Sequence, residues 1–110
     1  MQKRKQQRLE AQGWRVGTAA DFLGLSPEEA ALVELRLKLS TALRTRRTAL
    51  HLSQAAFAKR LHSSQSRVAK MEAADPTVSL DLLVRGLLAL GATPRDLAKA
   101  IQTRKPFVAA

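Results

Sequence analysis

The chain has 110 residues, enough for one small domain, and its 19 Lys and Arg against 9 Asp and Glu give a net charge of +10. It has no cysteine and only two histidines, which excludes disulfides and thiolate metal sites and leaves too few histidines for a metal site. No stretch approaches the roughly 18 apolar residues of a membrane span, so we expect a cytoplasmic protein with no membrane partner and no cofactor.

The positive charge is concentrated in the middle of the chain. Residues 35–71 hold nine Lys and Arg and no acid, whereas residues 16–34 have a net charge of −4 and residues 72–110 of +1. A long basic run without an acid indicates a polyanionic partner, most often nucleic acid. The alternative is an ordinary solvated surface.

The first 25 residues are predicted to form an N-terminal extension. Residues 1–12 are polar and basic with no apolar face, and we interpret them as a mobile arm. Residues 13–25 carry an apolar group and include a short helical segment from Thr18 to about Gly24. The apolar residues of this extension either enlarge the core or contact a second copy; they are Trp14, Val16, Phe22, Leu23 and Leu25.

Residues 26–103 are predicted to form an all-α domain, a compact bundle of about five helices. Ser26 and Pro27 begin a helix of about 20 residues, with acids in its first turn and bases near its end. One stripe of this helix should be buried: Leu32, Leu35, Leu39, Ala42 and Leu43.

Four shorter helices follow, each with a Ser or Thr before its first turn. Ser53 begins the first, and either Ser63 or Ser64 begins the second. The predicted spans are 54–61, 65–74, 80–90 and 94–103, and residues 104–110 remain as a tail.

Only three residues separate Leu61 from Gln65, which is the spacing of a helix-turn-helix. Two helices so close together must cross steeply. The inward residues are predicted to be Phe57, Ala58 and Leu61 on the first helix and Val68 and Met71 on the second.

The second helix of this pair must then present a polar row outward. This row begins at the helix N-terminus with Gln65 and contains Ser66, Arg67, Ala69 and Lys70. In a DNA major groove Gln can pair with adenine, and Arg or Lys with guanine. We therefore predict base-reading roles for Gln65, Ser66, Arg67 and Lys70.

The segment SQAAFAKRLHSSQSRVAKME, Ser53 to Glu72, resembles the helix-turn-helix of the Cro and phage-repressor (Xre) type, and the match covers about 39–101. The longer stretch from Gly13 to Thr93 is similar to small regulators of that family, including HigA-like antitoxins. The resemblance implies a lambda-repressor-like fold, with Gln54 and Ser64 holding phosphates and Arg47 paired with Glu72. His62 stands where the family usually has a left-handed glycine.

Phosphate contacts should dominate the affinity for DNA. We predict them for Arg44, Arg46, Arg47, Lys59 and Arg60. If about six basic groups of a dimer neutralise phosphates, the logarithm of affinity should fall with log salt at a slope near −5.

Residues 80–90 are apolar on more than one side of a helix, which suggests contact with a second copy. The predicted dimer interface contains Leu82, Leu83, Leu87 and Leu90. A two-fold dimer would place two reading helices about one DNA turn apart, on the half-sites of a palindrome.

These features predict a sequence-specific double-stranded DNA-binding transcriptional regulator, a dimeric repressor that occupies a palindromic operator. The alternative is the antitoxin of a toxin–antitoxin pair, which represses its own operon and binds a toxin protein through the N-terminal apolar group.

RNA is disfavoured because the chain has no Tyr and few aromatic residues for stacking. We expect no enzymatic activity, since no Ser-His-acid arrangement or Gly-rich phosphate loop is present, and steeply crossing helices disfavour a membrane-surface role.

Overall fold

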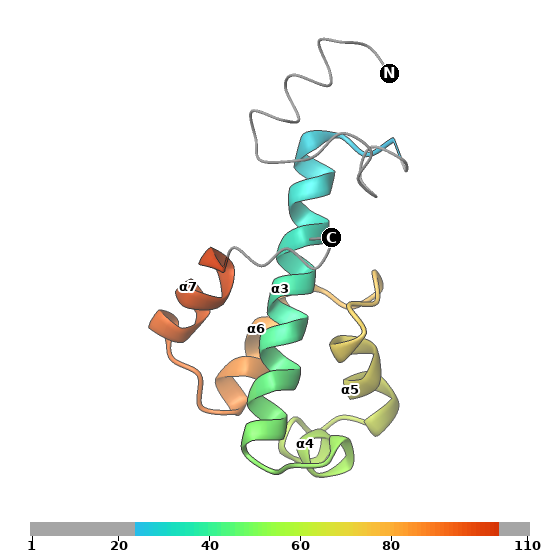
Figure 1. Ribbon diagram of the computed structural model, residues 1–110. Coiled ribbons are helices and arrows are strands. Elements are labelled where there is room, and N and C mark those ends of the chain that lie inside the picture. Colours follow the sequence, from blue (N-terminus) through green and yellow to red (C-terminus); the bar gives the residue numbers. More distant parts are fainter. Residues whose placement is uncertain (1–23, 104–110) are drawn as a thin grey trace.

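The computed structural model describes residues 24–103, which form five α-helices and no strand (Figure 1). The helices are α3 (Pro27–Ala49), α4 (Gln54–Arg60), α5 (Gln65–Glu72), α6 (Leu80–Ala89) and α7 (Pro94–Gln102). This confirms the predicted all-α fold. The predicted arm, the short helical segment that begins at Thr18 and the tail at 104–110 lie outside the described residues.

Every described helix begins at a hydroxyl side chain that accepts a hydrogen bond from a backbone N–H in the first turn. The five N-cap residues are Ser26, Ser53, Ser64, Ser79 and Thr93. The cap of α5 is thus Ser64 rather than Ser63. Such a cap stabilises a helix by about 1 kcal/mol, so the sequence places these helix starts with local signals alone.

The long helix α3 lies at the centre, with α7 on one side, α5 on the other and α4 across its C-terminal end (Figure 1). Leu39 and Leu43 on α3 are buried in the core. The other core side chains come from α4 to α6 and the loops beside them; the largest are Phe57, Val68, Met71, Val78, Leu83, Leu87 and Leu90.

Gly86 sets how closely α6 approaches the rest of the core. A Cβ atom at this position would lie 2.9 Å from Met71 Cε and 3.1 Å from Leu43 Cδ1. The absence of a side chain on α6 therefore leaves room for residues of α3 and α5.

One predicted member of the buried stripe is wrong. Leu32 is 44% exposed. The physical reason is the length of α3: its first turns extend beyond α4 to α7 (Figure 1). Leu32 is the sixth residue of α3 and so belongs to these turns.

The α4–α5 corner has the predicted helix-turn-helix form. Phe57, Ala58, Val68 and Met71 are buried, and Leu61 is half-buried at the turn. His62 has φ 54°, the left-handed conformation that the resemblance implied. This residue allows the chain to reverse within three residues and so fixes the angle between the two helices.

Candidate nucleic-acid interface

Helix α5 presents one buried side and one polar, exposed side. Val68 and Met71 have no exposed surface. The predicted base-reading residues lie on the other side and are all exposed; they are Gln65, Ser66, Arg67 and Lys70. Because no described segment covers this row, a DNA groove can reach it.

The start of α5 is suited to an anion. The Ser64 hydroxyl accepts a hydrogen bond from the Arg67 N–H at 3.1 Å, and its own O–H remains available as a donor. The unbonded N–H groups and the dipole of a helix N-terminus also favour negative charge. Ser64 is thus placed where the predicted phosphate contact requires it.

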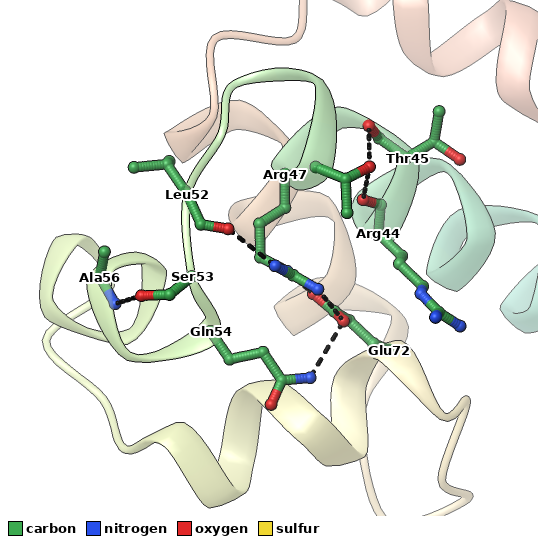
Figure 2. Close-up of polar contacts among 9 residues, drawn as sticks. Arg44, Thr45, Arg47, Leu52, Ser53, Gln54, Ala56 and Glu72 are labelled. Atoms are coloured by element: carbon green, nitrogen blue, oxygen red, sulfur yellow. Dashed lines mark hydrogen bonds and ion pairs between the residues drawn. The ribbon is translucent and has the colours of Figure 1, made fainter.

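A buried ion pair joins α5 to α3 (Figure 2). The Arg47 guanidinium donates from Nη2 to Glu72 Oε1 at 2.9 Å and also contacts Oε2 through Nε. Only 12% of the Arg47 side chain and 5% of the Glu72 side chain are exposed. The pair fixes the C-terminal end of the reading helix on the central helix.

The same carboxylate also holds α4 and the α3–α4 loop. Gln54 donates from Nε2 to Glu72 Oε1 at 3.1 Å, and Arg47 donates from Nη1 to the Leu52 carbonyl at 2.7 Å (Figure 2). Gln54 retains a second amide N–H for a phosphate. One network therefore sets the positions of both helices of the helix-turn-helix.

Glu72 is ionised at neutral pH. Burial raises the pKa of Glu72, but hydrogen bonds from Arg47 and Gln54 and the charges of Arg47 and Arg44 outweigh it, so the pKa lies below its ordinary value. The hydrogen bond to Glu72 also raises the pKa of Arg47. Both members therefore remain charged, which a buried pair requires to be stable.

Two basic residues of α3 for which no role was predicted form hydrogen bonds to other segments of the fold. Arg36 donates to the Val78 carbonyl before α6. Lys38 donates to the Ile101 carbonyl at 3.1 Å and lies 3.4 Å from Glu34. Each cation thus satisfies a carbonyl at the end of another element, and no local pattern in the sequence signals this.

Two of the residues predicted to contact phosphate make contacts within the fold. Arg46 donates from Nε to the Leu90 carbonyl at 3.1 Å and from Nη2 to the Gly91 carbonyl at 3.0 Å, and it lies 3.7 Å from Asp96. Arg47 is committed to Glu72 and to a backbone carbonyl. These guanidinium groups are held within the fold, so their phosphate contacts stay predictions and the cations without partners are the stronger candidates.

Five basic side chains of the central segment remain exposed, and no other residue of the described range forms a side-chain hydrogen bond or ion pair with them. They come from the end of α3, from α4 and from α5: Arg44, Lys59, Arg60, Arg67 and Lys70. Arg44 lies close enough to Glu72 for its charge to lower the pKa of that carboxyl. These five residues, here called the free cation set, are the candidate contacts for a polyanion.

The predicted dimer interface is also corrected. Leu83, Leu87 and Leu90 have exposed fractions of 0%, 3% and 4%, so they belong to the core and cannot contact a second copy. The reason is that neighbouring elements cover α6 on more than one side, so more of its apolar residues lie in the core than one buried stripe would contain. Leu82 is half-buried, and the large apolar side chains left on the surface of α6 and α7 are Leu88 and Ile101.

A groove between α3 and α7 was not predicted. Its volume is about 800 Å³, and small or apolar residues line much of it, including Thr41, Ala42, Thr45, Leu97 and Ala100. The small residues of α3 recur at helical spacing on the side that faces α7. This pattern is present in the sequence and could have indicated the groove, but the large apolar residues of this helix give the more prominent pattern.

Other site types find no support within residues 24–103. These residues contain no group of three His, Asp or Glu side chains that could hold a metal ion. Within the same range no helix has both the length and the apolar character needed to cross a membrane.

A model of the helix-turn-helix domain matches residues 38–101, more than half of the chain. No curated protein and no solved structure matches the sequence significantly. The matched range contains α4, the α4–α5 turn and α5 together with most of the core around them, and a second helix presented in this way is the DNA-reading element of such domains. The chain belongs to the helix-turn-helix domain family.

Proposed function

We propose that the protein is a sequence-specific double-stranded DNA-binding transcriptional regulator of the Cro and phage-repressor (Xre) type, which represses by occupying an operator. One observation carries the proposal: α5 presents Gln65, Ser66, Arg67 and Lys70 on an uncovered side while a buried ion pair holds its opposite end. The activity requires no cofactor, and we assign the protein no catalytic function.

In this proposal the N-terminal end of α5 enters the major groove. Gln65 pairs with adenine, and Arg67 or Lys70 pairs with guanine. Arg44, Lys59 and Arg60 contact phosphates on either side, together with Ser64 and the free amide N–H of Gln54. The phosphate contacts fix the position of the domain, and the row on α5 distinguishes sequences.

A dimer on a palindromic operator remains part of the proposal, but its subunits meet through a different surface from the one that the sequence predicts. Leu88 on α6 and Ile101 on α7 are 47% and 44% exposed, which gives a second copy an apolar contact that does not require the core leucines. A two-fold arrangement would then present two copies of α5 to half-sites one DNA turn apart.

Selection of bound sequences from a random duplex pool tests the proposal. We expect an enriched inverted repeat, and we expect Gln65→Ala and Lys70→Ala to change the preferred bases within each half-site. Arg60→Ala is the control, because loss of a phosphate contact should weaken all sequences alike. Recovery of no motif, or a uniform loss of affinity in Gln65→Ala, would contradict base reading by α5.

An autoregulating antitoxin is a second candidate, supported by the α3–α7 groove. This groove lies on the side of α3 away from α5 (Figure 1), so a toxin protein seated in it would not block the reading helix. Co-purification with the product of an adjacent toxin gene tests this candidate. Thr45→Arg, which fills the groove, should abolish toxin binding and leave DNA binding intact; toxin binding that survives this change contradicts the assignment.

A further inference from the structure

The first turns of α3 carry apolar side chains that no other described helix covers. Leu32 and Val33 are 44% and 40% exposed. Leu32 lies seven residues before Leu39, so it continues the core-facing side of α3 beyond the body of the domain. Figure 1 shows this part of α3 extending clear of α4 to α7. An apolar face that continues a core in this way is expected to be covered.

Ala30 shows that part of this region is covered. Its exposed fraction is 0%, yet it does not belong to the core cluster that α3 forms with α4 to α7. Those helices do not reach the first turn of α3 (Figure 1), so the core that they form with α3 does not account for the burial of Ala30.

Residues 24–26 lead into the first turn of α3. Gly24 has φ 70°, a left-handed conformation that glycine adopts without strain. Ser26 and Glu29 form a capping box, with backbone N–H to side-chain oxygen distances of 3.0 and 3.1 Å. Leu25 and Ala30 occupy the two positions of a hydrophobic staple, the arrangement that fixes the direction in which a chain meets a helix.

We propose that residues 13–23 of the same chain pack against the apolar face formed by Ala30, Leu32 and Val33. This segment ends three residues before the N-cap of α3, and its bulky apolar side chains are Trp14, Val16, Phe22 and Leu23. Its 11 residues span up to about 36 Å when extended. The first 11 residues of α3 cover about 16 Å, so the segment is long enough to cover the face.

The packed segment forms a small second core at the end of α3 opposite α4 and α5. It buries the side chains that the helix-turn-helix domain leaves exposed, and it supports the first turns of α3, which no other described helix covers. The proposal does not depend on DNA binding, because the reading helix lies at the other end of the molecule (Figure 1).

The chain contains a single tryptophan, so fluorescence of the full-length protein tests the proposal directly. We expect Trp14 to emit at a shorter wavelength than a solvent-exposed indole and to resist quenching by acrylamide. The double variant Leu32→Ser/Val33→Ser should move the emission to longer wavelength and increase quenching. Leu50→Ser, at an equally exposed apolar position after α3, is the matched control and should leave both signals unchanged.

Three outcomes would overturn the proposal. The first is a solvent-like Trp14 in the unchanged protein, which would leave the face open for another protein. The second is a protected Trp14 that becomes exposed on dilution, which would identify a second copy as the occupant. The third is an unchanged Trp14 signal in Leu32→Ser/Val33→Ser. Far-UV circular dichroism and operator binding by the variants separate local undocking from loss of the fold; if the double variant unfolds, Val33→Ser alone is measured.

Discussion

At the scale of single residues, three non-glycine residues within 24–103 hold left-handed backbone conformations: His51, His62 and Ala74. Ala74 follows the C-cap of α5 and donates its N–H to the Met71 carbonyl at 3.3 Å. A residue with a side chain pays about 1–2 kcal/mol for this conformation, and replacing it by glycine removes that cost. Glycine in turn lowers the stability by roughly 0.5–1 kcal/mol, because its unfolded chain has more conformational entropy to lose. We expect Ala74→Gly to stabilise the protein by up to about 1 kcal/mol in urea denaturation. Ala73→Gly, at a position with φ −86°, should destabilise it; equal destabilisation by both changes would contradict the argument.

A second residue-scale feature is a polar group without a partner. Ser40 on α3 is 2% exposed, and its hydroxyl forms no hydrogen bond in the described structure. A buried unsatisfied group costs about 1–3 kcal/mol. We expect Ser40→Ala to stabilise the protein by more than about 1 kcal/mol, measured by thermal or urea unfolding. Thr41→Ala, at the exposed neighbouring position, is the control, because it increases stability only through the higher helix propensity of alanine. The prediction is wrong if both variants raise the free energy of unfolding by the same amount.

At the scale of elements, the Arg47–Glu72 pair determines how α5 sits on α3. Because the pKa of Glu72 is lowered in the folded state, its contribution to stability is present above the ordinary value of 4.5 and is lost as the pH falls through the folded value. Glu72→Gln leaves Arg47 with an uncompensated buried charge, so we expect a loss of about 3 kcal/mol at pH 7. The difference from the unchanged protein should shrink as the pH falls below 4.5, as measured by urea denaturation at each pH.

The same pair gives a prediction for DNA affinity, and an acid outside the pair serves as its control. Hydrogen bonds from Thr93 lower the pKa of Asp96, which also feels the charge of Arg46, but Asp96 lies at the start of α7. Asp96→Asn should therefore leave the affinity for DNA nearly unchanged. Glu72→Gln should weaken binding to all sequences, because α5 loses its position. A change of base preference in Glu72→Gln without loss of stability would contradict a positioning role.

At the scale of the whole molecule, the parts that the sequence predicts are those set by local signals. The N-cap hydroxyls, Pro27 and the three-residue corner place the helices and the helix-turn-helix. The role of each cation is set by distant partners: Arg46 meets carbonyls of residues 90 and 91, more than 40 positions away. The leucines of α6 gave a wrong dimer surface for a related reason, because a helix that is apolar on several sides does not reveal which side its own domain covers.

The division between held and free cations gives a prediction for the assembled complex with DNA. Arg44 and Arg46 lie two residues apart on α3 and carry the same charge, but only Arg46 is bonded within the described fold. Arg44→Ala should reduce the slope of log affinity against log salt by about 0.9 per subunit, roughly 2 for a dimer. It should lower the free energy of unfolding only slightly, because the attraction of Arg44 to Glu72 is the smallest of the effects that lower the pKa of that carboxyl. Arg46→Ala removes charge-assisted hydrogen bonds, so we expect it to lower the free energy of unfolding by about 2 kcal/mol with no change in slope. Operator titrations at several salt concentrations, paired with urea denaturation, measure both quantities; a slope change in Arg46→Ala equal to that in Arg44→Ala would show that Arg46 also reaches a phosphate.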